Sequence, residues 1–549
     1  MAEKLNLEML LLPVFLVLLI SSNPYMASAS IEEANALLNW KASFANHTQS
    51  RLPSWNLLSH KPSTTSPCTW FGIFCNSAGS VIKINITSFG LNGTLQEFSF
   101  SSFPNLKYVD LYMNSLFGTI PSQIAFLSKL IYLDLSTNRF TGEIPPEIGL
   151  LTNLRVLHLA KNQLNGSIPL ELGNLTNLLE LDIGTNSLTG PIPTTLGNMN
   201  KLTMLFAYQN NLFGSIPHEL GNLKSLVMLH FAGNNLSGSI PPSFGGLRNL
   251  TLFDLSQNQL SGLIPRELGN LISLANLSLW QNQLTGSVPS SFGNLTNLEV
   301  IFLADNKLSG PIPHELGNLK SLVRLHFGGN NLSSSIPPSF GGLRNLTLLD
   351  LSQNQLSGPI PHELGNLKSL VKLHFGRNNL SGSIPPSFGG LRNLTLLELS
   401  QNQLSGLIPR ELGNLISLAN LSLWQNQLTG SVPSSFGNLT NLEVIILAYN
   451  KLSGPIPHEL GNLKSLVMLH FGGNNLSSSI PPSFGGLRNL NVLYLRENQL
   501  SGLIPEKLGN LISLTNLDLS QNQLYGGIPS EFGLLTNLEN LVLSEWCLE

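Results

Sequence analysis

The chain has 549 residues, of which 11% are charged, and its formal net charge is −3. This length exceeds what one compact core usually supports, so several domains or a repeat array are expected. The near-neutral balance lacks the basic bias of a nucleic-acid-binding protein, and no nucleic-acid partner is expected.

Residues 1–29 have the features of a secretory signal peptide. An apolar run from Met9 to Ile20 follows Lys4, and Ala27-Ser28-Ala29 forms a small-residue cleavage site. The run is short for a membrane span, although an uncleaved anchor is the alternative. Because no later segment is long and apolar enough for a span, the sequence predicts a secreted, extracellular chain, located in the cell wall or at the plasma-membrane surface.

The chain contains three cysteines. Cys68 and Cys75 are close in the sequence, and in a secreted chain this spacing favours a local disulfide. Cys547 has no evident partner.

An asparagine recurs every 24 residues from Asn114 to Asn522, which gives 18 units without an insertion. In Leu133-Asp134-Leu135 the alternation predicts a short strand whose leucines point inward. The asparagine amide can donate and accept, so it can satisfy turn backbone groups of its own and neighbouring units. The element Gly142-Glu143-Ile144-Pro145 then permits a turn and prevents a long helix.

No unit can bury its apolar edge alone, so the units are predicted to stack into a solenoid. The strand side is narrower than the returning segment and should be concave. About 19 coils at a strand spacing of about 4.8 Å give a sheet on the order of 90 Å long.

The unit L-x-x-L-x-x-L-x-L-x-x-N-x-L-x-G-x-I-P resembles the plant-specific class of leucine-rich repeats. Upstream, the segments 36–41, 52–55 and 67–75 resemble the N-terminal cap of plant receptor-like kinases and receptor-like proteins. The resemblance implies an α/β leucine-rich-repeat solenoid, a curved right-handed superhelix with a parallel β-sheet on the concave face and short 3-10 or helical turns on the convex face. We expect a signal peptide at 1–29, a cap at 30–80, and about 19 repeats plus a broken terminal one at 81–549.

Residues 217–354 and 361–498 are near-copies, offset by six units, that differ at 13 positions. Eleven of the 13 fall at positions −6, −4, −2 and −1 from the repeat asparagine, on the solvent side of the strand and its exit. Tolerance of exposed positions to change is the alternative reading, but exposed back-side residues such as Lys224 and Arg248 match their copies. We interpret the concave face as a recognition surface on a fixed scaffold.

The same columns contain aromatic and charged residues that suit a protein interface. A basic stretch in the middle of the array could meet a peptide carboxylate or an acidic side chain, although a solvated surface is an equal alternative. The candidate ligand-binding residues are Tyr208, Trp280, Phe302, Arg324, His326, Asp350, Lys372, His374, Arg377, Trp424, Tyr449 and Tyr494.

Neither a metal site nor catalysis is expected. The closest concave histidines, His326 and His374, are two coils apart, or roughly 10 Å, which is too far to share one ion. The repeated aspartates lack a companion nucleophile or base, and the chain has no kinase motifs, so it is predicted not to be an enzyme and to need no cofactor.

Sixteen N-x-[ST] sequons suit a glycosylated extracellular surface, although an asparagine- and serine-rich repeat also produces them by chance. Asn276 and Asn420 fall on the strand face, where a glycan would block binding. The predicted glycosylation sites are Asn46, Asn85, Asn92, Asn165, Asn174, Asn235, Asn249, Asn294, Asn331, Asn345, Asn379, Asn393, Asn438 and Asn475.

The leading hypothesis is a plant receptor-type recognition module that binds a secreted peptide or protein on its concave face, with a co-receptor as a further partner. One alternative is a secreted inhibitor of a microbial wall-degrading enzyme. Another is a structural cell-wall adhesion protein, which uniform surface columns would favour. The chain ends inside a repeat, so the sequence leaves open a truncated receptor and a secreted relative.

Overall fold

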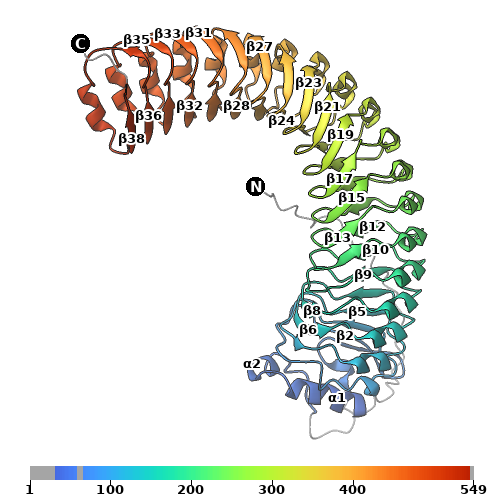
Figure 1. Cartoon of the computed structure of the whole chain (residues 1–549). Helices are drawn as coiled ribbons and strands as arrows, with labels where there is room; N and C mark the ends of the chain where they lie inside the picture. Colours follow the sequence, from blue (N-terminus) through green and yellow to red (C-terminus); the bar gives the residue numbers. More distant parts are fainter. Residues whose placement is uncertain (1–30, 58–65, 545–549) are drawn as a thin grey trace.

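The computed structural model describes residues 31–57 and 66–544, and the chain forms a long curved solenoid (Figure 1). The predicted signal peptide and Cys547 lie outside these residues. Within the described part, no helix has the length and apolar character that crossing a membrane requires.

A 21-stranded sheet lines the concave face. Its first two strands pair antiparallel, and every later strand pairs parallel with the strand 24 or 25 residues before it. The strands, in the order in which they pair, are β1 (Ile73–Cys75), β2 (Val81–Asn85), β3 (Tyr108–Asp110), β5 (Tyr132–Asp134), β7 (Val156–His158), β9 (Glu180–Asp182), β10 (Met204–Phe206), β12 (Met228–His230), β14 (Leu252–Asp254), β16 (Asn276–Ser278), β18 (Val300–Phe302), β20 (Arg324–His326), β22 (Leu348–Asp350), β24 (Lys372–His374), β26 (Leu396–Glu398), β28 (Asn420–Ser422), β30 (Val444–Ile446), β32 (Met468–His470), β34 (Val492–Tyr494), β36 (Asn516–Asp518) and β38 (Asn540–Val542).

The repeat asparagines lock neighbouring coils together, as the sequence predicts. Asn330 Nδ2 lies 3.0 Å from the carbonyl oxygens of Leu303 in the previous coil and Phe327 in its own coil. Its Oδ1 accepts from Leu308 N at 3.0 Å. Each repeat asparagine therefore satisfies backbone hydrogen-bonding groups in its own turn and in the previous coil. This requirement explains why the asparagine recurs at every 24th residue.

A second sheet on the flank of the solenoid is absent from the sequence-based prediction. It has 14 strands, from β11 (Phe213–Ser215) to β37 (Gln523–Leu524), and three strands precede it as a separate sheet. The glycine of the G-x-I-P element lies here with positive φ, as at Gly310 (φ 77°). Glycine therefore serves inside a short strand rather than only in a turn.

Short 3-10 helices cover the convex face, from η4 (Ser122–Phe126) to η21 (Ser530–Leu534). From η5 (Pro146–Leu150) onward each of these helices carries a glycine, which allows close stacking. A Cβ on Gly341 in η13 (Pro338–Gly342) would lie 2.4 Å from the carbonyl oxygen of Glu363 in the next coil. At Gly342 a Cβ would instead meet Lys320 Nζ at 2.7 Å. Glycine here is required for the spacing between coils.

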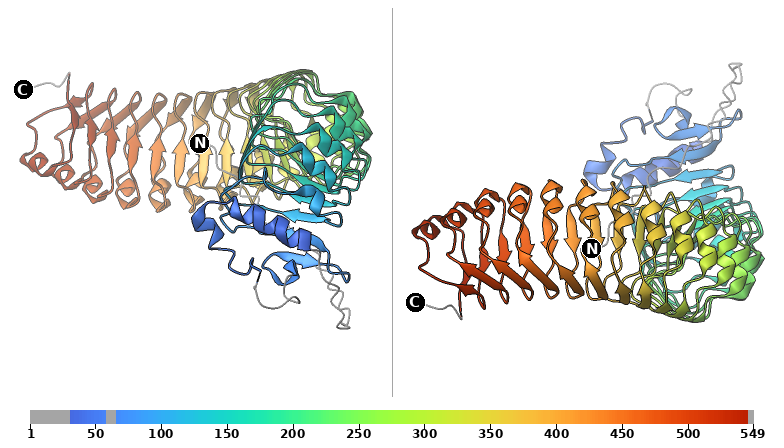
Figure 2. Two further views of the ribbon diagram at one scale, coloured as in Figure 1. Left: turned by 90° about the horizontal axis from the view of Figure 1, so that it is seen from below. Right: turned by 90° about the horizontal axis from the view of Figure 1, so that it is seen from above.

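The N-terminal cap closes the first coil, on one end of the solenoid (Figure 2). Its helices are α1 (Ile31–Ala42) and α2 (Asn46–Gln49), and Trp40 of α1 packs edge-on against Phe98 with ring centroids 5.0 Å apart. The predicted disulfide between Cys68 and Cys75 is present.

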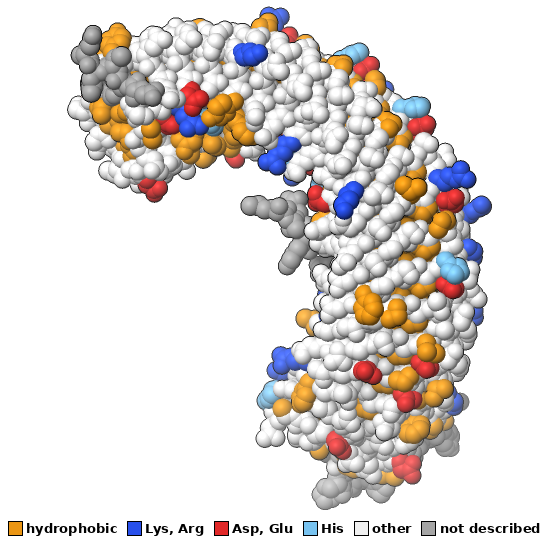
Figure 3. All heavy atoms as spheres, viewed as in Figure 1, with side chains coloured by type: hydrophobic (Ala, Val, Ile, Leu, Met, Phe, Trp, Pro, Cys, Tyr) orange, Lys and Arg blue, Asp and Glu red, His pale blue; other side chains and the backbone are white. Residues whose placement is uncertain are grey.

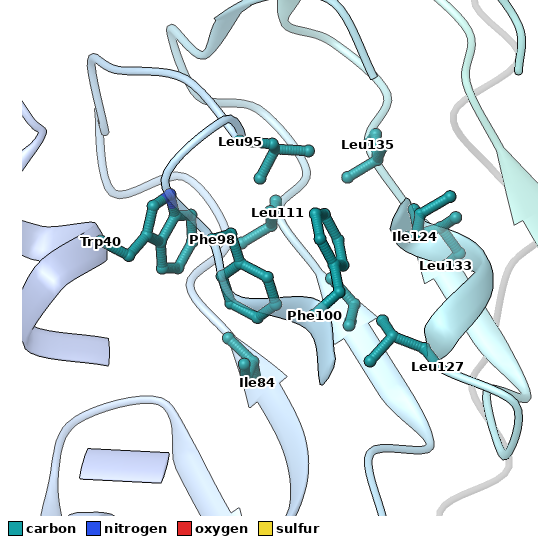
Figure 4. A pocket seen from close by; sticks show the side chains of 11 residues that line it. Trp40, Ile84, Leu95, Phe98, Phe100, Leu111, Ile124, Leu127, Leu133 and Leu135 are labelled. Atoms are coloured by element: carbon teal, nitrogen blue, oxygen red, sulfur yellow. The ribbon is translucent and has the colours of Figure 1, made fainter. Parts of the chain in front are cut away.

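A small apolar cavity lies between the cap and the first coils (Figure 4). Its lining residues, which include Phe100, Leu127 and Leu135, are all apolar, and Trp40 Nε1 donates instead to the carbonyl of Thr94 at 2.8 Å. Without polar groups to orient a ligand, the cavity is a packing gap in the core rather than a binding site.

Candidate functional site: the concave face

The concave strands present two outward side chains each, at positions −6 and −4, because the central residue of each strand is buried. In β20, for example, Arg324 and His326 point outward and Leu325 is fully buried. The flank of the solenoid, where the second sheet lies, differs from the concave face in its content of charged side chains. Figure 3 shows one flank as a mostly uncharged surface, with Lys, Arg, Asp, Glu and His side chains gathered along the convex rim and the concave edge.

The predicted basic stretch forms one cluster over β20, β22 and β24. His326 and His374 both approach the same oxygen, Asp350 Oδ2, at 3.1 and 3.3 Å. Arg324 and Lys372 flank Leu348 in register, one strand to either side. We call Arg324, His326, Lys372, His374 and Arg377 the basic patch.

Asp350 lies beneath this patch and is 9% exposed. Burial alone would raise the pKa of Asp350, but hydrogen bonds and positive charge from His326 and His374 outweigh burial and hold it well below its usual range. Burial alone would lower the pKa of His374, but the hydrogen bond with Asp350 raises it above the ordinary histidine value. The buried carboxylate therefore favours a positive charge on the patch and fixes its imidazoles.

Two of the predicted residues extend the patch. Arg324 places its guanidinium 5.4 Å from the ring centroid of Phe302. Arg377 is exposed, and its Nε donates to Gln401 Oε1 at 2.7 Å. Both cations are thus held on the open face, and within residues 31–57 and 66–544 neither forms an ion pair with a carboxylate.

Tyr208 belongs to a separate aromatic cluster nearer the N-terminus. Its ring stacks on His230 with centroids 4.5 Å apart, and Phe206 meets His230 edge-on at 5.6 Å. Burial lowers the pKa of His230 despite the charge of Asp254. This cluster therefore presents aromatic rings, with the carboxylate of Asp254 3.4 Å from His230 Nε2.

Tyr449 and Tyr494 form a third cluster, around His470. Tyr494 meets His470 edge-on at 5.2 Å, and Tyr449 does so at 6.4 Å. The guanidinium of Arg496 lies 6.0 Å from the ring centroid of Tyr449 and bonds its hydroxyl. Arg496 was not among the predicted site residues, although it is one of the positions that differ between the two copies.

Trp280 and Trp424 occupy equivalent positions in the two copies and are half-buried at the exits of β16 and β28. The structure does not bring either of them into the other clusters. The predicted site residues therefore fall into three clusters and two separate tryptophans along one face.

A charged cluster that sequence reasoning missed lies near the start of the array. His158 Nε2 is 3.1 Å from Glu180 Oε2, and Nδ1 is 3.5 Å from Asp134 Oδ2. Burial alone would lower the pKa of His158, but these two carboxylates raise it to about 9. The 24-residue register of Asp134 and His158 is the signal that could have revealed it.

Most predicted glycosylation sites lie at the surface. Twelve of the 14 asparagines are exposed, and only Asn85 and Asn92 are half-buried. The four at the starts of flank strands, Asn235, Asn331, Asn379 and Asn475, lie away from the concave strands.

Family models match much of the chain. The leucine rich repeat N-terminal domain matches residues 30–76, and leucine rich repeat models match segments between 129 and 524. The chain is 45% identical over 119 residues to MDIS1-interacting receptor like kinase 2 of Arabidopsis thaliana, a match that spans 21% of this chain and only 11% of that protein.

Solved structures cover more of the chain. The ectodomain of the Arabidopsis receptor kinase GASSHO1/SCHENGEN3, in complex with CASPARIAN STRIP INTEGRITY FACTOR 2, is 41% identical with a TM-score of 0.84, covering 94% of this chain and 62% of that one. The Arabidopsis receptor kinase HAESA, in complex with the peptide hormone IDA and the co-receptor SERK1, is 34% identical with a TM-score of 0.81, covering 94% and 90%. These matches confirm the predicted fold class, and the chain belongs to the family of plant leucine-rich-repeat receptor kinases, whose ectodomain it resembles over nearly its whole length.

Proposed function

We propose that the chain is an extracellular recognition module that binds a secreted peptide on its concave face. The observation that carries this proposal is the basic patch, in which a buried carboxylate supports cations on an open sheet. A free carboxylate or acidic side chain of an extended peptide would bind Arg324 and Lys372, which stand about 10 Å apart across β22.

The comparisons support this reading. HAESA is in complex with the peptide hormone IDA and the co-receptor SERK1, and GASSHO1/SCHENGEN3 is in complex with CASPARIAN STRIP INTEGRITY FACTOR 2. A co-receptor is therefore part of the proposal for this chain. Signalling by a kinase would require sequence beyond these repeats, because the chain itself carries no kinase motif.

Peptide binding to the secreted chain tests the proposal. Synthetic peptides with free and amidated C-termini, including CASPARIAN STRIP INTEGRITY FACTOR 2 and IDA, would be titrated by calorimetry, and the bound site mapped by hydrogen exchange. We expect protection over β20 to β34. Protection restricted to the convex 3-10 helices would refute the proposal.

The role of the basic patch is tested by charge reversal. Arg324→Glu with Lys372→Glu should weaken binding about tenfold or more, because a favourable charge pair becomes repulsive, without loss of secretion. The matched control is Arg344→Glu with Arg392→Glu, which reverses two exposed arginines on the convex side and should leave affinity unchanged. Unchanged binding in the first variant would exclude the patch from the binding site.

A further inference from the structure

Asn85 occupies an unusual place for a glycosylation sequon, because it lies on a strand of the concave sheet. Asn85-Ile86-Thr87 follows the consensus, and Ile84 and Ile86 are buried on either side of Asn85. The alternation of a strand therefore turns the Asn85 side chain outward, beside Asp110 on β3.

On the other side of Asn85 lies Gly72, a cap residue next to β1 that has no side chain. Asn85 N donates to the carbonyl of Gly72 at 2.8 Å, and a Cβ on Gly72 would lie 2.3 Å from the Asn85 carbonyl oxygen. Gly72 also has a φ of 75°, which favours glycine. The two backbones are therefore in close contact, and the residue opposite Asn85 contributes no side chain that could cover the Asn85 amide.

Two exposed aromatic residues flank Gly72 in the chain, and Phe74 pairs in register with Lys83, two residues before Asn85 on the same strand. Phe71 is 51% exposed and Phe74 is 52% exposed. Phe71 stacks on Phe89 at 4.8 Å, and the Nζ of Lys83 lies 5.3 Å from the centroid of Phe74. Each ring is supported by a neighbour within the protein and still exposes about half of its surface to solvent.

The amide of Asn85 is available for modification. Its Oδ1 accepts from Thr87 N at 3.3 Å and from Thr87 Oγ1 at 3.0 Å. Among the described residues, Nδ2 of Asn85 has no hydrogen-bond partner, whereas Nδ2 of a repeat asparagine such as Asn330 donates to buried carbonyls. Nδ2 is the atom that carries an N-linked sugar.

We propose that Asn85 carries an N-linked glycan whose first sugar packs over Gly72 between Phe71 and Phe74. During secretion Nδ2 displaces the diphosphate of a lipid-linked oligosaccharide: the C1–N bond forms, the C1–O bond to phosphate breaks, and one amide proton is released. The slightly positive C–H bonds of the sugar then lie on the negative ring faces. The chain's own carbohydrate thus covers the N-terminal end of the concave face and confines ligand binding to later strands.

The experiment measures how accessible this glycan is in the folded chain. The full chain is secreted from plant cells treated with a mannosidase inhibitor, so that every glycan is oligomannose, and is digested undenatured with endoglycosidase H. Mass spectrometry follows each site. Asn379 is the reference, because it is exposed and its register partners on the flank sheet, such as Ser357, include no aromatic residue.

We expect Asn85 to be occupied and to be cleaved about tenfold more slowly than Asn379, because two ring contacts must open first. Phe71→Ser with Phe74→Ser should raise the Asn85 rate to within about twofold of Asn379. Phe117→Ser with Phe126→Ser, which removes two exposed rings elsewhere, should leave it slow. If the first pair is not secreted, Phe74→Ser alone must still raise the rate.

An unmodified Asn85 in the secreted wild-type chain would overturn the proposal, and Phe71 and Phe74 would then be free for a protein partner. Cleavage at the rate of Asn379, or equally slow cleavage without the two rings, would overturn it as well. Peptide affinity is measured separately, so this outcome leaves the proposed function untouched.

Discussion

Arg496 donates a hydrogen bond from Nη2 to the hydroxyl of Tyr449, which lies 47 residues earlier and two coils away. The coil between them presents Gly472 and Gly473 at the same positions. A Cβ on Gly473 would lie 2.6 Å from Tyr449 Cδ1, and one on Gly472 would lie 3.0 Å from Arg496 Cγ. The absence of two side chains therefore allows this contact on the binding face.

Gly473→Ala should break that contact. The new methyl displaces the Tyr449 ring, so we expect a loss of about 1–2 kcal/mol of unfolding free energy beyond the loss for Gly329→Ala. Gly329 is the matched control, because it has the same φ of 67° and faces Asp305, whose flexible carboxylate can move. Denaturant unfolding of both variants measures the difference. Equal losses would show that Tyr449 is not held by the contact.

Asp350→Asn should lower the pKa of His374. The amide removes the negative charge that the two imidazoles share, so His374 would titrate below its wild-type value. Nuclear magnetic resonance titration of the histidine ring protons, with His374→Gln for assignment, measures the shift. Asp305→Asn removes an exposed carboxylate elsewhere on the face and should leave His374 unchanged. If the pKa of His374 were unchanged in Asp350→Asn, Asp350 would not be the group that raises it.

His158 should make stability depend on pH above neutrality. Its folded pKa of about 9 exceeds the unfolded value of 6.5, so its contribution is fully present below pH 6.5 and is lost as pH rises through 9. The groups that face it are Asp134, Glu180 and, by charge alone, Asp182.

The shift corresponds to about 2–3 kcal/mol between pH 6 and pH 10. His158→Gln should therefore lower the free energy of unfolding by this amount at pH 6 and by little at pH 10. Denaturant unfolding at both pH values measures the two differences. His314→Gln, which removes an exposed histidine on the convex side, should retain the wild-type pH dependence. A His158→Gln chain with wild-type pH dependence would rule out this charge cluster.

Gly341→Ala should disrupt the stacking of the convex helices. Its methyl meets the backbone carbonyl of Glu363, which cannot move without separating the coils, so we expect a loss of about 2 kcal/mol or more. Gly342→Ala meets only the end of the Lys320 side chain and should cost about 0.5 kcal/mol. Melting temperatures of the secreted variants provide the comparison. A similar loss in both would show that coil spacing does not require Gly341.

The sequence by itself determined the coil. A period of 24 residues with alternating leucines determines which side chains point into the core. A shift of one residue in a strand would turn every leucine to solvent. The repeat asparagine was likewise predictable, since a buried turn needs one side chain that both donates and accepts. The disulfide between Cys68 and Cys75 followed from their spacing and the secreted context.

Only the tertiary structure decided which side chains meet between coils. His326 and His374 are 48 residues apart and share one oxygen of Asp350, and Arg496 reaches Tyr449 only over glycines. The flank sheet is also invisible in one unit, because its strands are two to five residues long and form only beside neighbours. Such contacts depend on the reach of side chains and on the gaps left by missing ones, which a repeat pattern does not record.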